Sequence, residues 1–464
     1  MSTTTLKGAH LSLQQDRLQF FQQGSRTYRS QCTVFMKGML NRRVFQQALQ
    51  QLVEQHTIFQ TVFYSPAGMD VPIQVMGHQV AFSFPMINLE EIDGSRQHIV
   101  LHTLLTSLQE QAFDLKHGPL FCPVTFHLSA ETTLLLISLP ALCADVFTLP
   151  LLVADLVKRY RASLSGQECT EEPLQYTAVS AWQKQVLLEE SEGAQTAHEF
   201  WKKWDVSRVT QVQQLLEQAG LVKHGSLQAT HKTIFEPLTL PLEVEEAVSR
   251  RIRALASDCH VSVTAILLAC WFIVLWRLTD ESQFVIGVAC DGRNYEELAE
   301  AMGLYTRFVP LSAYLEDDWT FEQVVTFIEP LLEAARKYQS YFSWPGVPNA
   351  TTASPSPSFF PVTFEHERWP ASFPAEELTL SLDQRWCCTE PFILKLGILQ
   401  VGERLQVELH YDPQSVMTER VTRLASMLQV LLQSVVEQPQ APVGTLTLLT
   451  ADEQSHLLTT FRAP

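Results

Sequence analysis

The chain has 464 residues, a formal net charge of −17, 46% hydrophobic residues and 18% charged residues. This length suits two or three lobes of ordinary domain size, and the composition provides a large core and argues against disorder. The acidic balance argues against nucleic acid as a partner, because neutralising phosphates requires concentrated Lys and Arg.

The cysteines and the apolar runs favour a cytoplasmic protein with no membrane partner. The nine cysteines are an odd number without regular spacing, and adjacent Cys387 and Cys388 are poorly placed to bond to each other, so we expect reduced thiols. Residues 1–10 are polar and lack the apolar core of a signal peptide. The longest purely apolar run, residues 265–276, is shorter than the ~18 residues that indicate a membrane span, so it predicts a buried helix.

The first half of the chain contains elements that can hold a site between them. Residues 41–56 have apolar side chains at helical spacing, and Asn41 can cap this helix. Residues 132–139 form a nearly continuous apolar run, too short for a typical helix, which predicts a buried strand. A short loop follows, and then a helix over residues 149–160 with Thr148 as its cap. A loop held between two rigid elements is a suitable place for a site.

The second half repeats this mixture of elements without repeating the sequence. We expect a strongly apolar helix over residues 262–278 and an amphipathic helix over residues 417–436. Residues 345–358, rich in Pro, Ser and Thr, predict a surface loop. Strands are expected over residues 284–290, 359–364 and 406–410, with a turn at residues 291–294. Strands and helices mix throughout, which indicates α/β or α+β lobes.

Several segments carry a resemblance that covers essentially the whole chain. In the first half they are residues 12–18, 54–63, 112–115 and 118–120, and in the second half Gly287 and residues 292–294, 303–312, 408–412 and 446–458. In this order they resemble the motifs of the condensation domains of nonribosomal peptide synthetases. Some positions depart from the family: Gln55 and Gln60 stand where it usually has arginines, and Arg307 and Ser312 stand where it often has Asn and Arg.

The resemblance implies a fold and a set of partners. The family's fold consists of two chloramphenicol-acetyltransferase-like lobes in a V-shaped pseudo-dimer with a tunnel between them. On this basis we expect an N-terminal lobe of residues 1–180 and a C-terminal lobe of residues 181–464, which ends at the linker to an adenylation domain. Carrier proteins would dock at the two mouths of the tunnel and supply the phosphopantetheine arm, so the chain itself is expected to bind no cofactor.

The family's active-site motif is His-His, three further residues, and Asp-Gly. The resemblance places it after the strand at residues 132–139, where the sequence reads Pro140, Ala141, Leu142, Cys143, Ala144, Asp145 and Val146. Only the aspartate remains, and no histidine lies between His127 and His198. The second histidine is thought to position or deprotonate the acceptor amine, and a general base contributes about 10²- to 10⁴-fold. We therefore expect standard amide-bond formation to be lost.

Two residues inside this motif have a chemical and a structural interpretation. The resemblance implies that Asp145 forms a structural salt bridge with Arg293 in the Gly-Arg-Asn turn, and such a pairing would weaken the carboxylate as a base. Cys143 is either an acyl-transfer nucleophile or a small buried hydrophobe. The absence of a nearby histidine that could lower its pKa favours the second interpretation.

The remaining histidines do not predict a metal site. His98 and His102 share one face of a helix, but no third ligand accompanies them. His366, between two glutamates at the end of a predicted strand, either faces the tunnel or is solvated. The sequence contains no phosphate-binding loop of the Walker type and no zinc-finger spacing.

Two functions follow. The first is a non-catalytic condensation domain that acts as a scaffold for the adenylation domain, a gate for carrier proteins, or a platform that recruits a tailoring enzyme. The second is an acyltransferase that still joins carrier-bound groups without a histidine, because proximity alone can supply several kcal/mol. The domains on either side would discriminate between them: an upstream carrier loaded with an acyl donor favours the enzyme.

Overall fold

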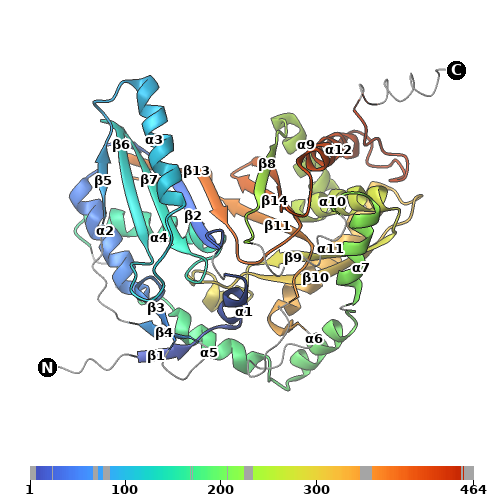
Figure 1. The fold of residues 1–464 in the computed structure, drawn as a ribbon, viewed down its shortest axis with the longest axis horizontal. Helices are drawn as coiled ribbons and strands as arrows, with labels where there is room; N and C mark the ends of the chain where they lie inside the picture. The colour runs from blue at the N-terminus through green and yellow to red at the C-terminus, as the bar shows by residue number, and fades with distance from the viewer. Residues whose placement is uncertain are drawn as a thin grey trace.

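The computed structural model describes residues 7–22, 25–65, 72–76, 84–167, 169, 171–205, 207–223, 234–344, 358–450 and 453. Figure 1 shows two lobes side by side, joined in the middle, in the outline of a V. Each lobe combines strands and helices, so the expected mixed α/β class is confirmed. Most of the expected loop at residues 345–358, and the last part of the segment 446–458, lie outside the described residues.

The N-terminal lobe is built on a six-stranded sheet, called here the N-terminal sheet. Helices α2 (Arg42–Gln55) and α4 (Thr148–Leu164) pack against one of its faces, and α3 (Gly94–Gln109) packs against the other. Two strands of this sheet, β12 and β13, come from the second half of the chain, and β13 pairs antiparallel with β2. The strand order is β12 (Phe373–Ala375), β13 (Leu378–Cys387), β2 (Arg29–Gly38), β7 (Thr132–Pro140), β6 (Cys122–Ser129) and β5 (Met86–Asn88).

The C-terminal lobe is built on a second six-stranded sheet, called here the C-terminal sheet. Alternate side chains of its strands, such as Phe364 and Leu409, pack into a large core together with four helices. These are α9 (Glu246–Asp258), α10 (Val263–Thr279), α11 (Phe321–Tyr338) and α12 (Thr418–Glu437). The side chains between them, such as Glu367 and Glu408, lie on the face that meets β13. The strand order is β10 (Arg307–Tyr314), β9 (Gln283–Cys290), β11 (Val362–Trp369), β14 (Leu394–Val401), β15 (Arg404–Tyr411) and β8 (Leu238–Leu242).

Helices cover both lobes, and a small sheet of β1 (Lys7–His10), β4 (Ile73–Met76) and β3 (Val62–Tyr64) lies beside α5. The helices of the first half are α1 (Leu13–Phe21), α2 (Arg42–Gln55), α3 (Gly94–Gln109), α4 (Thr148–Leu164), α5 (Tyr176–Val186), α6 (Glu192–Lys202) and α7 (Ser207–Gln218). Those of the second half are α9 (Glu246–Asp258), α10 (Val263–Thr279), α11 (Phe321–Tyr338) and α12 (Thr418–Glu437). Single 3₁₀ turns occur at η1 (Thr57–Gln60), η2 (Glu296–Leu298) and η3 (Gln339–Tyr341).

Most of the expected elements are present, with two corrections. Asn41 caps α2 through the amide of Val44, as its residue type predicts. Thr148 is the first residue of α4 and not its cap, and its amide is bound by the side chain of Asp145. His366 lies in the middle of β11 and not at its end, because this strand runs further than the apolar pattern indicates.

No single helix among the described residues is long and apolar enough to cross a membrane. Helices α9 and α10 pass such a test only when they are taken together, and they meet at an angle of 106°. The apolar run that predicts a buried helix is α10, whose residues from Thr264 to Trp276 are all buried.

The boundary between the lobes near residue 180 stays a prediction. That residue lies inside α5, which contacts α1, the small sheet and η3. Strands β12 and β13 belong to the N-terminal sheet, although strands β8 to β11 of the C-terminal sheet precede them in the sequence. The chain therefore returns to the first lobe and then goes back to the second.

Candidate functional site

The loop that follows β7 lies where the two lobes meet, and its side chains are closed off from solvent. Pro140 is the last residue of β7, and α4 begins at Thr148. The side chains between them are buried: Ala141, Leu142, Cys143, Ala144 and Asp145 are 0% exposed and Val146 is 2% exposed. We call residues 140–146 the motif loop.

Polar side chains of the first lobe hold the backbone of the motif loop. The side-chain amide of Gln15 donates to the carbonyl oxygen of Leu142 over 2.9 Å, and the hydroxyl of Ser30 donates to that of Ala144 over 2.7 Å. Within the loop, the amide of Cys143 donates to the carbonyl oxygen of Pro140. These bonds satisfy the carbonyl oxygens of Pro140, Leu142 and Ala144 inside the buried loop.

Asp145 and Arg293 form an ion pair between the two lobes. The Arg293 Nη2 atom lies 3.3 Å from the Asp145 Oδ1 atom, and the two side chains are 4% and 0% exposed. Arg293 also donates to the carbonyl oxygens of Asp291 and Ala301, and its guanidinium lies 4.5 Å from the centre of the Tyr305 ring. The structure therefore brings together the two residues that the resemblance pairs.

Backbone amides saturate the Asp145 carboxylate from both lobes. The amides of Thr148, Tyr305 and Thr306 each donate to it over 2.8 Å. Burial alone would raise the pKa of Asp145, but Arg293 and these donors outweigh it and hold the pKa below its ordinary value. A carboxylate with so many donors is a structural anion and a poor proton acceptor.

A second set of contacts beside the motif loop closes the same junction. The Tyr176 hydroxyl donates to the carbonyl oxygen of Leu304 over 2.6 Å and lies 2.7 Å from the hydroxyl of Ser12. Gly303 packs on the Tyr176 ring with φ +147°, and a Cβ atom there would come within 2.1 Å of it. The ring can therefore lie in this position only because residue 303 is glycine.

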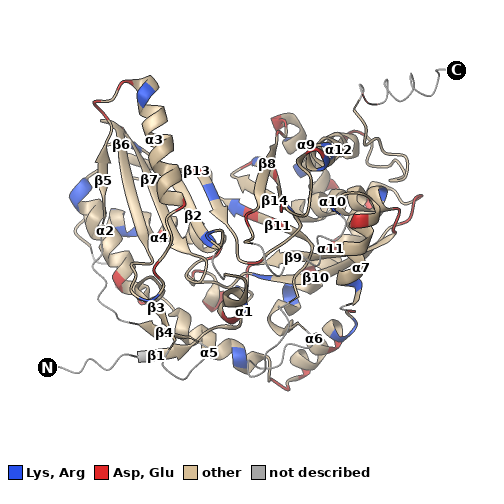
Figure 2. Ribbon diagram, viewed as in Figure 1, with Lys and Arg blue, Asp and Glu red and all other residues tan. Residues whose placement is uncertain are grey.

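A second group of charged residues lies between the lobes, and the sequence does not reveal it. We call it the interlobe charge cluster; it consists of Glu365, Glu367, Arg385, Lys395, Glu408 and His410. Figure 2 shows positively and negatively charged segments on β13 and β11 in the middle of the molecule. Arg385 of β13 forms ion pairs with Glu367 and Glu408, and Lys395 lies 3.0 Å from Glu365.

Strand register explains why these residues meet. Lys395 is opposite His410, and Gly397 is opposite Glu408, in the antiparallel pair of β14 and β15. The parallel pair of β11 and β14 places Glu365 beside Gly397. All of these side chains therefore lie on one face of the C-terminal sheet, and Arg385 reaches them from the N-terminal sheet.

The charges within the cluster shift its pKa values in opposite directions. Burial raises the pKa of Glu367, which also lies near Glu365, although Arg385 opposes this effect. Burial would also raise the pKa of Glu408, but His410 and Arg385 lower it to about 2. Burial, and then Lys395, lower the pKa of His410 to about 4, so its imidazole is neutral at pH 7.

The other candidate residues lie outside these groups. Burial raises the pKa of Cys143 far above that of an ordinary thiol, so the thiolate needed for a nucleophile is absent at neutral pH. His98 and His102 are exposed on α3, and within the described part of the chain no three His, Cys, Asp or Glu side chains gather as metal ligands do. His366 is partly exposed and faces α10, where its Nδ1 atom lies 2.9 Å from the Thr264 hydroxyl.

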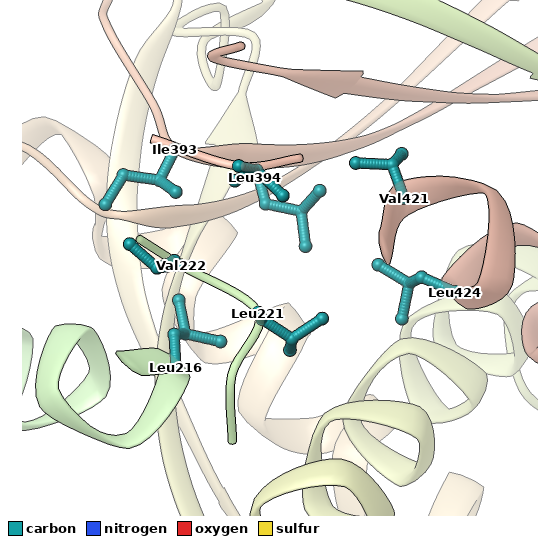
Figure 3. Close-up of a pocket in the computed structure, with 8 residues that line it drawn as sticks. Leu216, Leu221, Val222, Ile393, Leu394, Val421 and Leu424 are labelled. Atoms are coloured by element: carbon teal, nitrogen blue, oxygen red, sulfur yellow. The ribbon is translucent and has the colours of Figure 1, made fainter. Parts of the chain in front are cut away.

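A small cavity in the C-terminal lobe is part of the core. Figure 3 shows its lining, which comes from the end of α7 and the segment after it, from the start of β14 and from α12. Its volume is about 10 Å³ and its wall is entirely apolar, so it has no group that would bind a polar ligand. The lining residues are Leu216, Leu221, Val222, Ile393, Leu394, Val416, Val421 and Leu424.

Comparison with known proteins identifies the family. A model of the condensation domain family matches residues 7–458, which is nearly the whole described chain. The chain therefore belongs to the condensation domain family, and the resemblance seen in the sequence motifs is confirmed.

The relatives of the chain are much longer synthetases and structures of the same fold. Malpibaldin synthetase of Mortierella alpina is 22% identical over 97% of this chain, which spans only 8% of that protein. The condensation domain from monacolin K polyketide synthase MokA has a TM-score of 0.77 at 17% identity, with 94% of this chain and 99% of that chain covered. The complex of the X-domain and OxyB from teicoplanin biosynthesis contains a chain with a TM-score of 0.69 at 18% identity, with 97% and 98% covered.

Proposed function

We propose that this chain is a condensation domain that has lost standard amide-bond formation and serves a larger nonribosomal peptide synthetase as a scaffold, carrier gate or recruiting platform. The observation that carries the proposal is Ala141, a fully buried methyl group in the motif loop at the position we assign to the catalytic histidine. An alanine has no nitrogen or oxygen within its side chain that can take a proton from an amine.

The neighbouring groups do not replace the missing base. Asp145 is bound by Arg293 and three backbone amides, and its pKa is lowered, so it holds a proton poorly. Cys143 is 0% exposed and its pKa is raised by burial. Asp145 therefore joins the two lobes, and Cys143 is a buried thiol of the motif loop, so neither supports a role as the missing base.

The comparisons support the choice of partners. The curated relatives are synthetases of which this chain spans a small part, so we propose that an adenylation domain and carrier proteins lie in the same assembly and that the carriers supply the phosphopantetheine arm. A chain of the same fold was solved in a complex with OxyB. By analogy we propose that a tailoring enzyme is one partner that this domain can recruit.

The test supplies the domain with a donor carrier and an acceptor carrier, both loaded, and follows the condensed product by mass spectrometry. We expect the amount of product to equal that of a reaction without the domain. The variant Ala141→His is expected to give little rescue, because Pro140 and Val146 also differ from the family motif and the loop is fully packed.

One result would support the alternative, a histidine-independent acyltransferase. This result is turnover by the unaltered domain that the variant Asp145→Asn abolishes while the protein remains folded. Asp145 would then be the working base, and the scaffold proposal would be wrong.

A further inference from the structure

A hydroxyl, an imidazole and a carboxylate are linked where β15 of the interlobe charge cluster pairs with β8. The Nδ1 atom of His410 lies 2.8 Å from the hydroxyl of Thr239, and its Nε2 atom lies 3.3 Å from the Oε2 atom of Glu408. Thr239 on β8 is directly opposite His410 on β15. With the ring proton on Nε2, His410 donates to Glu408 and accepts from the Thr239 hydroxyl.

Other threonine–histidine contacts in the chain lack the features of this one. Thr133 binds Nδ1 of His127 over 2.8 Å, and Thr264 binds that of His366 over 2.9 Å. Within the described chain neither of these imidazoles pairs with a carboxylate, and both threonines are buried, at 4% and 2% exposure. Thr239 differs from both because it is an exposed residue, whereas the histidine that its hydroxyl contacts is buried.

The surroundings of His410 hold the imidazole in place. The chain of contacts continues to Arg385, whose Nη1 atom donates to Glu408 over 2.6 Å. Gly397 leaves the room that the ring needs, because a Cβ atom there would lie 2.8 Å from the Nε2 atom of His410. The rings of Trp386 and Phe392 lie 5.8 and 6.4 Å from the imidazole and form an apolar wall beside it.

We propose that Thr239, His410 and Glu408 form a second acyl-transfer site, at which Thr239 accepts an acyl group from a thioester. The Thr239 oxygen attacks the thioester carbonyl while its proton moves to Nδ1 of His410, so that a C–O bond forms. The C–S bond then breaks, and the imidazolium returns the proton to the departing thiolate. The products are a free thiol and an ester on Thr239, which water or an amine can later cleave.

Each residue of the site has a role that the geometry supports. His410 is neutral at pH 7, so its Nδ1 atom has a free lone pair for the Thr239 proton. Burial and Lys395 make this imidazole a weaker base than an ordinary one, and Glu408, 3.3 Å from Nε2, opposes them by stabilising the imidazolium that forms. β8 is the last strand of the C-terminal sheet, so one of its edges faces no further strand among the described residues. Backbone amides on such an edge can donate to the oxyanion of the tetrahedral intermediate.

The test incubates the full chain with the hexanoyl thioester of N-acetylcysteamine and maps the acylated peptides by mass spectrometry. Neutral hydroxylamine treatment first removes acyl groups from cysteine thiols, so that only oxygen esters remain. We expect one acyl group on Thr239. The variant Thr239→Ser should retain the label, Thr239→Ala should lose it, and His410→Gln should slow labelling by about 100-fold or more, as loss of a general base does.

A matched control separates this site from ordinary threonine–histidine pairs. Thr133→Ala removes the hydroxyl of a pair without a carboxylate, and its labelling at residue 239 should equal that of the unaltered chain. Thr239 is exposed on an edge strand, so its substitution should leave the circular dichroism spectrum unchanged.

An unlabelled Thr239 in the folded, unaltered chain, or a label that persists elsewhere at the same level in Thr239→Ala, overturns the proposal. The assay needs no acceptor carrier, and it measures ester formation on Thr239 and not amide formation at the motif loop. A negative result therefore leaves the proposed loss of condensation unaffected.

Discussion

Two buried ion-pair groups join the lobes, and they distribute their charges in opposite ways. At the motif loop, a single carboxylate, Asp145, accepts from Arg293 and from three backbone amides. In the interlobe charge cluster, Arg385 is shared by Glu367 and Glu408, while Lys395 pairs with Glu365. The pKa of Asp145 is lowered, whereas the pKa of Glu367 is raised, although both side chains are almost fully buried.

The difference shows that burial alone does not set the pKa of a buried acid. The number of donors that bind its carboxylate decides whether the pKa is lowered or raised. Burial disfavours the charged form of both acids, and only a sufficient set of donors reverses this effect. The motif loop has an excess of donors and the cluster has an excess of acceptors. Asp145, with its lowered pKa, is therefore expected to keep its charge until the pH falls below the ordinary range of an aspartate, whereas Glu367, with its raised pKa, takes up a proton at a higher pH.

The largest expected effect comes from removing the carboxylate of the motif loop. Asp145→Ala leaves the Arg293 guanidinium and three amides buried without their acceptor, which should lower the free energy of unfolding by about 3–5 kcal/mol. Denaturant unfolding measures this loss. The control is Lys158→Ala, which breaks an exposed pair with Glu171 and should cost at most about 1 kcal/mol. Equal losses in the two variants would contradict the structural role of Asp145.

The variant Arg385→Met should produce a somewhat smaller loss, about 3 kcal/mol at pH 7, because two carboxylates then face each other without a cation. The loss should shrink at acidic pH for two reasons. Glu367, whose pKa is already raised, takes up a proton first, and the unaltered chain itself loses the stabilisation from Glu408 as the pH falls from 4.5 towards about 2. Unfolding measured across this range checks the trend, and a loss that stays constant with pH would break the contrast between the two groups.

A steric change beside the motif loop should have an intermediate effect. Gly303→Ala retains every charge but places a Cβ atom within 2.1 Å of the Tyr176 ring, at a backbone conformation that only glycine adopts readily. We expect the melting temperature to fall, corresponding to a loss of about 1–3 kcal/mol. Gly166→Ala is a suitable control, since its φ of +66° is also positive but no atom lies within 4 Å of the added Cβ. If the two variants lose the same stability, the packing of Tyr176 contributes nothing.

The smallest effect is expected at Cys143, which is neutral and fully buried in the motif loop. Cys143→Ala should cost about 1 kcal/mol, as a small core substitution does. In the folded chain the thiol should resist iodoacetamide, because burial raises its pKa and blocks access. Peptide mapping after brief labelling checks this, with the partly exposed Cys169 as the reactive reference. Rapid labelling of Cys143 would show that the loop opens.

The sequence predicts the elements around the motif loop well, because they are local features. The apolar run at residues 132–139 predicts β7, and the expected turn at residues 291–294 follows β9 and contains Arg293. The resemblance pairs this arginine with Asp145, and the structure has this ion pair. The prediction that Thr148 caps α4 was wrong, because a side chain three residues earlier binds its amide. Such a bond competes with the cap that residue type alone favours.

The interlobe charge cluster and the second acyl-transfer site were not predictable in the same way. Arg385 meets Glu408 only because β13 joins one sheet and β15 the other, and no local pattern indicates which sheet a strand joins. Strand β8, with Thr239, was not expected at all, since it is a short edge strand with mostly exposed side chains. The sequence places His410 on the expected strand over residues 406–410. Its contact with Thr239 depends on how β8 and β15 pair, which the sequence does not indicate.

The return of β13 to the N-terminal sheet has a consequence for how the chain folds during synthesis. β13 covers β2 along most of its length, from Leu378 opposite Gly38 to Cys387 opposite Ser30. Until the ribosome has made residue 387, β2 therefore has one open edge, and the first lobe cannot complete its hydrogen bonding. Contacts of such long sequence separation slow folding and leave an edge strand open to wrong partners. A fragment that ends near residue 180 should accordingly aggregate, and adding residues 373–387 as a separate peptide should restore its solubility.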